Sequence, residues 1–260
     1  MSKKQGRNLP YSISQNFLTS RKTIEKLISK TDISITDTVL EVGAGKGHIT
    51  KTLSDKCKTV ISYEIDQKLY TKLKPQLSKN VKLYQGDFLK CTLPKGHYKV
   101  FANIPFSRTT EIIRKLTNAP NAPEGIWLVM EKGAAKRFCG VPCENVNSLL
   151  LKPFFELKII WYFDRNDFHP APGTDVVMLE MKLKKDADIP FEQKNDFLTF
   201  LNSGFKNGVY GSHGLLTKKQ VSTALKLAKL PMIEPTGDIS YIQWLCLFRC
   251  WQKFKKNNRM

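Results

Sequence analysis

The feature that most constrains this fold is a short buried strand that runs directly into a glycine-rich loop. Thr38–Val42 is rich in β-branched and apolar residues, Gly43, Gly45 and Gly47 follow it, and a helical pattern begins at His48. Glycines adopt positive φ and let the backbone approach a ligand, while the start of the next helix offers free N–H groups. This unit predicts a ligand site at the carboxyl end of the strand.

Strands and helices continue to alternate after this unit. The strands are expected at Val60–Glu64, Val81–Tyr84, Tyr98–Ala102 and Ile126–Met130, and the helices at Gln67–Leu77 and Thr109–Leu116. Such alternation predicts an α/β fold, with a parallel sheet covered by helices on both faces. Ligands of such sheets bind at the carboxyl ends of the strands.

The pattern changes near residue 184. Three amphipathic helices are expected at Lys194–Phe205, Lys218–Leu230 and Ile239–Phe254, with Thr217 and Asp238 as N-caps of the second and third. We therefore expect a catalytic domain over residues 1–183 and a small all-α C-terminal domain over residues 184–260.

Charge is the strongest compositional signal. The 260 residues include 42 Lys and Arg against 23 Asp and Glu, a formal net charge of +19. This surplus favours a polyanionic partner such as nucleic acid, the alternative being solubility alone. The basic residues at the start are not followed by an apolar stretch, so we expect no secretory signal, and no apolar run reaches the roughly 20 residues that a membrane span needs. We expect a cytoplasmic protein without a membrane partner.

Four of the six cysteines form two pairs with three residues between them. The pairs are Cys139 with Cys143 and Cys246 with Cys250. On a helix this spacing places both thiols on one face, which is typical of small core residues rather than of a zinc site or a disulfide. No metal is expected.

Acidic residues close the second and third strands. Glu64 lies 21 residues after Gly43, where a carboxylate accepts hydrogen bonds from ribose hydroxyls, and its neighbour Ile65 is also expected to contact the cofactor. Asp87 is placed to accept from an adenine amino group, with Phe88 stacking on the ring. The glycine loop is no Walker A motif, and Glu41 before it suits a cationic ligand better than a pyrophosphate. An adenosine with a cationic group fits, which favours S-adenosylmethionine over NAD.

The fourth strand ends in Asn103-Ile104-Pro105-Phe106. If the Asn103 side-chain oxygen and the Ile104 carbonyl accept both N–H groups of an aryl amine, its lone pair turns toward a sulfonium methyl group. Pro105 stiffens the backbone and Phe106 offers a face on which a base stacks. The alternative is a simple turn after a strand. The quartet predicts methyl transfer by orientation rather than by strong base catalysis.

These motifs together resemble the rRNA adenine N6-methyltransferases, and within them the Erm branch. The resemblance covers most of residues 11–180 and rests on Gln15-Asn16-Phe17-Leu18, Glu41–Gly47, Glu64, Asp87, Asn103–Phe106 and Phe168-His169-Pro170-Ala171-Pro172. It implies a Rossmann-like methyltransferase sheet, S-adenosylmethionine as cofactor and methylation of an adenine in 23S rRNA. That reaction confers macrolide, lincosamide and streptogramin B resistance. The alternatives are a small-subunit rRNA adenine dimethyltransferase of the KsgA branch and a non-catalytic RNA-binding relative.

The resemblance also implies roles for individual residues. Gln15, Asn16 and Leu18 would line the methionine end of the cofactor, which Gly43, Gly45 and Asn103 would also contact. Phe168 would close the second side of a flipped adenine, with core packing as the equal alternative. The chain departs from the family where Phe106 replaces a common Tyr and where residues 173–176 differ from the usual pattern.

Basic residues are expected to hold the RNA. Lys132, Lys136 and Arg137 resemble a basic helix of Erm relatives, Arg108 follows the quartet, and Lys3, Lys4 and Arg7 form an N-terminal arm. Together they predict salt-dependent backbone binding. We expect a monomer that acts on 23S rRNA before subunit assembly is complete. The sequence leaves open whether the C-terminal helices touch RNA or only support the catalytic domain.

Overall fold

The computed structural model describes residues 16–210, 215–234 and 237–257, which form two compact units. The first unit contains the chain up to Ala135 together with Lys158–Leu183. The second contains Lys136–Leu157 and the chain from Lys184 onward. Gln15 and the basic residues Lys3, Lys4 and Arg7 lie outside the described residues.

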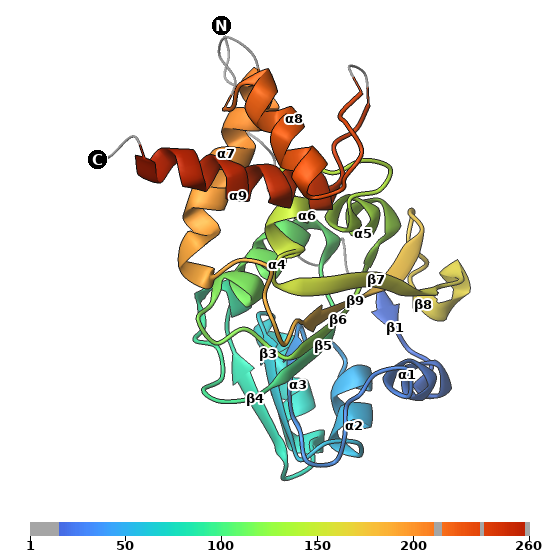
Figure 1. Cartoon of the computed structure of the whole chain (residues 1–260). Helices are drawn as coiled ribbons and strands as arrows, with labels where there is room; N and C mark the ends of the chain where they lie inside the picture. The colour runs from blue at the N-terminus through green and yellow to red at the C-terminus, as the bar shows by residue number, and fades with distance from the viewer. Residues whose placement is uncertain (1–15, 211–214, 235–236, 258–260) are drawn as a thin grey trace, which may run out of the picture. The chain divides into compact units, whose positions relative to one another are not determined.

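A seven-stranded sheet with the order β4-β3-β2-β5-β6-β9-β7 organises the first unit (Figure 1). Its strands are β2 (Thr38–Val42), β3 (Thr59–Glu64), β4 (Val81–Gln85), β5 (Lys99–Asn103), β6 (Gly125–Glu131), β7 (Phe155–Tyr162) and β9 (Val176–Leu183). The five strands from β4 to β6 are parallel, so β2, β3, β4 and β5 all end at one edge. The predicted α/β class is correct, and the loops after these strands meet at that edge.

The expectation of a wholly parallel sheet is wrong at one side. β9 pairs antiparallel with β6, from Gly125 opposite Lys182 to Glu131 opposite Val176. A strand that is parallel to its neighbour needs a crossover connection. β9, which follows β7 and β8 in the chain, instead runs antiparallel to β6. Apart from the basic helix that the resemblance implied at Lys132, Lys136 and Arg137, sequence analysis assigned no element between residues 131 and 183, where the structure places two helices as well as β7, β8 and β9.

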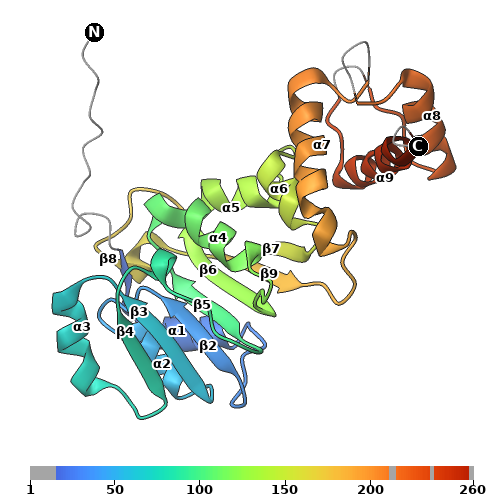
Figure 2. The same ribbon diagram turned by 90° about the vertical axis from the view of Figure 1, so that its left-hand side faces the viewer.

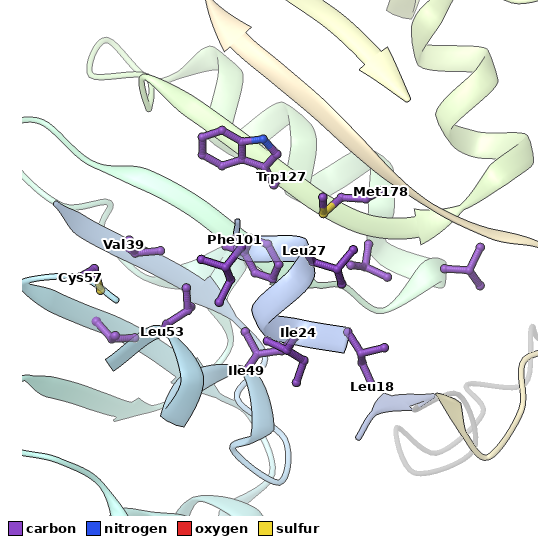
Figure 3. Packing of buried hydrophobic residues seen from close by; sticks show 14 of the residues in the cluster. Leu18, Ile24, Leu27, Val39, Ile49, Leu53, Cys57, Phe101, Trp127 and Met178 are labelled. Atoms are coloured by element: carbon purple, nitrogen blue, oxygen red, sulfur yellow. The ribbon is translucent and has the colours of Figure 1, made fainter. Parts of the chain in front are cut away.

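Helices α1 (Arg21–Ile28) and α2 (His48–Ser54) cover one face of this sheet. Figure 3 shows Ile24 and Leu27 of α1 and Ile49 and Leu53 of α2 packed with strand residues that include Phe101. These side chains are at most 7% exposed. Because side chains alternate along a strand, Asn103 lies on the same face as Phe101. The core therefore fixes which way the end of β5 points.

Other helices complete the first unit. They are α3 (Gln67–Leu73) and α4 (Thr109–Asn118), and in Figure 2 α4 lies on the face of the sheet opposite α1 and α2. A two-stranded sheet pairs β1 (Phe17–Leu18) with β8 (Phe168–His169). Short 3-10 helices occur at Lys74–Gln76, Phe88–Lys90, Phe106–Arg108, Arg165–Asp167 and Phe191–Gln193.

The second unit is helical. Its helices are α6 (Val146–Leu151), α7 (Lys194–Asn207), α8 (Lys218–Leu227) and α9 (Tyr241–Asn257), while α5 (Lys132–Cys139) spans the division between the units. Buried aromatic rings join α7 to α9, with the Phe197 and Phe248 centroids 4.8 Å apart. None of the described helices is both long and apolar enough to cross a membrane.

Two local expectations for the second unit need correction. Thr217 caps α8 as predicted, but α9 begins at Tyr241, and Ser240 rather than Asp238 exchanges hydrogen bonds with Gln243 across its first turn. Cys143 is exposed and lies beyond the end of α5 at Cys139, so that cysteine pair does not share a helix.

Candidate active site

A cavity of about 140 Å³ opens where β2, β3, β4 and β5 end. Its walls come from the loops after these four strands and from residues 16–18, which precede α1. Nearly all the residues predicted to bind a ligand meet there: Asn16, Leu18, Gly43, Gly45, Glu64, Ile65, Asp87, Phe88, Asn103, Ile104 and Phe106. The topology thus gathers segments that are up to 90 positions apart in the chain (16 to 106).

The glycine loop forms one wall because its backbone is held back against β3. The Gly43 and Ala44 amides both donate to the Tyr63 carbonyl, at 3.0 and 3.1 Å. Gly43 has φ +80°, and a Cβ built on it would meet no atom within 4 Å, so its Cα borders open space. Gly45 has φ +56°, and a Cβ there would lie 2.7 Å from the Phe17 ring. Glycine is required at Gly45 by both backbone conformation and space.

Glu64 connects this loop to the end of β3. Its Oε2 accepts from the Gly45 amide at 2.6 Å and its Oε1 from the Asp66 amide at 2.8 Å, and the residue is 2% exposed. Each carboxylate oxygen can accept two hydrogen bonds, so both retain a lone pair for a ligand hydroxyl. Glu64, the residue predicted to bind the ribose, therefore also holds the glycine loop in place.

Asp87 follows β4 and is satisfied on one side only. Its Oδ1 caps a short helix by accepting from the Leu89 amide at 2.9 Å. Its Oδ2 accepts no hydrogen bond from any residue that the structure describes. The neighbouring Phe88 is 6% exposed and packs at 5.9 Å against the Tyr63 ring. An amino group that enters the cavity here finds an acceptor beside an aromatic wall.

Glu41 lies beneath the glycine loop and is completely buried. Its Oε2 accepts from Thr50 at 2.6 Å and from Ser62 at 2.7 Å, whereas its buried Oε1 has no partner among the described residues. Burial raises the pKa of Glu41 to about 7, with an added contribution from the Glu64 charge, against the lowering effect of the two hydroxyl donors. This wall of the cavity therefore offers an acceptor that is still without a donor.

The quartet after β5 places an amide at the cavity. The Asn103 side-chain nitrogen donates to the backbone carbonyl of Asn16 at 2.7 Å. That bond orients the amide, and within the described part of the chain nothing donates to its Oδ1. Pro105 and Phe106 are held by the Arg108 amide, which donates to the Pro105 carbonyl, and by the Thr109 hydroxyl, which donates to the Phe106 carbonyl, both at 3.0 Å. The quartet is a braced loop that presents an amide oxygen.

The structure does not bring Phe168 into the cavity. Leu18 and Phe168 are opposite each other in the β1–β8 pair, and Phe168 is 4% exposed, with its ring 5.2 Å from Phe163 in the core. Cross-strand partners share a face, so Phe168 faces the core while Phe17, one residue before Leu18, lies over Gly45. The pairing nevertheless joins two motifs that sequence analysis had treated separately.

Sequence reasoning missed several groups at this site. Phe17 was noted only as part of a motif, and Tyr63, Lys46 and His48 also line the cavity. Burial lowers the pKa of His48, and the charges of Lys46 and Lys51 lower it further. Of these residues, only Tyr63 could have been predicted to line the cavity, because it directly precedes Glu64 at the end of a strand.

The described residues contain no cluster of three or more His, Cys, Asp or Glu that could hold a metal ion. They do fit an adenosine derivative. The unpaired acceptors Glu41 Oε1, Asp87 Oδ2 and Asn103 Oδ1 suit a ligand rich in donors, and Gly43 leaves room for it.

Known proteins are similar to this chain in sequence and in fold. Residues 6–207 match the family described as ribosomal RNA adenine dimethylase. The rRNA adenine N-6-methyltransferase of Bacillus licheniformis is 32% identical over 253 residues, which cover 94% of this chain and 88% of that protein. The enzyme of the same description from Lysinibacillus sphaericus is 34% identical over 244 residues, or 93% of this chain and 96% of that protein.

Solved structures agree with these relatives. The crystal structure of the 23S rRNA methyltransferase ErmE matches with a TM-score of 0.79 and 26% identity, covering 91% of this chain and 100% of that one. A dimethyladenosine transferase from Plasmodium falciparum shares the fold, with a TM-score of 0.68 and 20% identity over 93% of this chain and 98% of its own.

Proposed function

Since the chain belongs to the ribosomal RNA adenine dimethylase family and is an rRNA adenine N6-methyltransferase, we propose that it methylates one adenine of 23S rRNA. This membership confirms the family resemblance that the motifs predicted. We further propose that S-adenosylmethionine is the methyl donor and that the modified rRNA makes the ribosome resistant to macrolide, lincosamide and streptogramin B antibiotics.

The observation that carries the proposal is the orientation of Asn103. Its Nδ2 donates to the Asn16 carbonyl at 2.7 Å. This bond fixes the amide so that Oδ1 is left to accept a hydrogen bond from an incoming donor. An adenine amino group that donates to this oxygen and to the Ile104 carbonyl has its lone pair redirected out of the ring plane. Phe106 lines the same cavity and offers a stacking surface. Orientation of a weak nucleophile is the main contribution of the protein to the reaction.

The cofactor occupies the other walls of the cavity in this proposal. S-adenosylmethionine supplies an electrophilic methyl group on a sulfonium centre. Glu64 accepts from the ribose hydroxyls, and Asp87 Oδ2 accepts from the adenine amino group beside Phe88. Gly43, Gly45, Asn16 and Leu18 border the methionine end, where Glu41 Oε1 favours the cationic part of the ligand.

The choice of 23S rRNA is supported by the likeness to ErmE at 26% identity and by Ile104, where the small-subunit branch typically has Leu. Incubation with labelled S-adenosylmethionine and either protein-free 23S rRNA or assembled small subunits tests this choice. Label in 23S rRNA is expected, and one nucleotide should carry it in mass mapping. Label confined to the small subunit would replace this proposal by the dimethylation of two adjacent adenines.

Asn103→Ala distinguishes the enzyme from a non-catalytic RNA-binding relative. The variant should bind cofactor and RNA but fail to transfer the label, and it should fail to raise the macrolide concentration that inhibits a sensitive host. A host protected equally by the wild type and the variant would show that RNA binding alone is the function.

A further inference from the structure

The loop after β4 contains both residues proposed to hold the cofactor adenine, Asp87 and Phe88, and a lysine of α4 bonds to it. The ammonium of Lys115 donates to the Leu89 carbonyl at 3.0 Å and also to the Cys91 carbonyl. It lies 5.3 Å from the centroid of the Phe88 ring. Two carbonyls and an aromatic face use most of the binding capacity of one ammonium. Residues 87–91 are called the adenine loop below.

The hydrogen bonds that the adenine loop makes within itself give it a shape but not a position. Asp87 accepts from the Leu89 amide through Oδ1 and from the Lys90 amide through its carbonyl, both at 2.9 Å. The Cys91 amide donates to the Phe88 carbonyl at 3.1 Å. These bonds close a single turn of 3-10 helix, an element with poor hydrogen-bond geometry. The bonds from Lys115 add a connection from this turn to α4.

The local position of Lys115 does not require this contact. Lys115 occupies the last turn of α4, where a cation interacts favourably with the helix dipole even when it stays in water. Its side chain is nevertheless partly buried, and its ammonium bonds to carbonyls that lie 24 and 26 positions earlier in the chain. Removing water from an ammonium and fixing a long side chain both cost free energy. The two carbonyl bonds offset that cost, and they act on the adenine loop.

The other end of α4 supports the catalytic quartet. The helix begins at Thr109, whose hydroxyl donates to the Phe106 carbonyl at 3.0 Å. Ile112 and Leu116 are at most 2% exposed and fix α4 to the sheet. Lys115 follows Thr109 by six residues, which is about 9 Å along the helix axis. One rigid helix therefore contacts the loop proposed to bind the target base and the loop proposed to bind the cofactor adenine.

We propose that Lys115 is a positioning residue for the cofactor. It holds the adenine loop so that Asp87 Oδ2 accepts from the 6-amino group of the adenine while Phe88 faces the ring. The inference rests on the proposed function in that the ligand is S-adenosylmethionine, but it does not depend on which rRNA is methylated. Lys115 acts only through the loop and touches no reacting atom.

The test measures how well each variant distinguishes two ligands of nearly the same shape. S-adenosylhomocysteine has the 6-amino group, and S-inosylhomocysteine has a carbonyl oxygen in its place. Lys115→Met removes the donors and keeps an unbranched side chain, whereas Lys115→Arg keeps donors for both carbonyls. Lys90→Met is the charge control, because Lys90 is an exposed lysine of the same loop. Lys99→Met is the stability control, because this partly buried lysine donates to the Asp32 carbonyl at the opposite edge of the sheet.

Isothermal titration calorimetry should show that Lys115→Met raises the Kd of S-adenosylhomocysteine by roughly 10- to 30-fold. Its preference over S-inosylhomocysteine should fall from at least about tenfold in the wild type to less than about threefold, because the acceptor is no longer held in place. Lys115→Arg, Lys90→Met and Lys99→Met should each keep both Kd values within about threefold of the wild type. The KM for S-adenosylmethionine should rise in Lys115→Met while kcat at saturating cofactor changes less than about threefold.

A double-mutant cycle gives a second readout. Asp87→Asn should cost about tenfold in affinity in the wild type but less than about threefold in Lys115→Met, because the two residues act through one loop. Additive losses would show that Lys115 does not act through Asp87 and would overturn the proposal. If Lys115→Met does not fold, Lys115→Gln replaces it in both measurements, since one amide group can still donate to one of the carbonyls.

Three other results would also overturn the proposal. They are wild-type Kd values in Lys115→Met, equal losses for both ligands so that the preference is kept, and a loss of the same size in Lys90→Met. The second would make Lys115 a support for the fold alone, and the third would assign the effect to net charge. Failure of the proposed function is recognised separately, because the wild-type enzyme would then bind neither ligand or would place no label in 23S rRNA.

Discussion

The two edges of the sheet differ in whether their charged and polar side chains have partners. At the amino edge, the ammonium of Lys99 bonds to Asp32 at 3.0 Å, to Asp37 at 2.9 Å and to the Asp32 carbonyl at 2.7 Å. Lys182 of β9 adds a bond to Asp32 at 3.1 Å. At the carboxyl edge, Glu41, Asp87 and Asn103 each keep an oxygen without a donor among the described residues.

This difference separates stability from binding within one sheet. Buried polar groups are normally hydrogen-bonded, because an unpaired one loses its water without compensation. The amino edge follows that rule and gains stability from it. At the carboxyl edge the buried Oε1 of Glu41 breaks that rule, at a cost in stability, whereas the free oxygens of Asp87 and Asn103 belong to side chains that are only partly buried. Substitutions at the two edges should therefore affect different measurements.

The largest effect is expected for Asn103→Ala. Loss of the oriented amide oxygen should lower kcat at least about 1,000-fold, equivalent to about 4 kcal/mol. The thermal midpoint should change little, because among the described residues the Asn103 side chain makes one hydrogen bond, to Asn16. Single-turnover transfer of labelled methyl groups measures the rate, and calorimetry checks that cofactor still binds. Retained activity would remove Asn103 from the mechanism.

Glu41→Gln should reveal the stability that the carboxyl edge gives up. The pKa of Glu41 is raised by burial from 4.5 to about 7, so its contribution is fully present below pH 4.5 and is lost as pH rises through 7. Between pH 5 and pH 8 the wild type should lose about 3 kcal/mol relative to the variant, which has no charge to bury. Urea unfolding of both proteins at each pH measures this difference. Parallel pH profiles would contradict it.

Lys99→Met should lower the free energy of unfolding by about 2 kcal/mol at pH 7 and leave kcat unchanged. Removing one partner of a buried pair costs more than this, but Asp32 is half exposed and partly screened.

The pH dependence of this effect has the opposite sign to that of Glu41. Burial alone would raise the pKa of Asp37, but hydrogen bonds from Lys99 and Ser34 outweigh it and the net pKa is lowered from 3.8. Stabilisation is therefore present above that value and lost as pH falls through the lowered pKa. The gap between wild type and Lys99→Met in urea unfolding should close below about pH 4.

The smallest effect is expected for Asp87→Asn. Oδ1 can still cap the helix at Leu89, but the new amide presents a donor where the ligand amino group needs an acceptor. Cofactor affinity should fall about tenfold, or 1.4 kcal/mol, as measured by isothermal titration calorimetry. Asp66→Asn is the matched control, because Asp66 caps α3 without lining the cavity. Equal loss in both variants would assign the effect to capping.

Local patterns predicted the first half of the molecule well. β2 and β5 are buried along most of their length while buried and partly exposed residues alternate along β3, and all four strands from β2 to β5 were placed within one or two residues of their ends. The strands between residues 155 and 183 were missed, because β7, β8 and β9 depend on partners that no nearby residue signals. The role expected for Phe168 failed to find support for the same reason, since its direction depends on pairing with Leu18.

The sequence by itself determined the α/β class, the glycine loop and which polar residues close the strands, because these follow from periodicity and backbone preference over a few residues. Only the tertiary structure decided which oxygens remain unpaired. The bond from Asn103 to Asn16 joins residues 87 positions apart, and that from Gly45 to Glu64 spans 19. Packing of the whole sheet and its helices brings such groups together, and no local pattern encodes those distances.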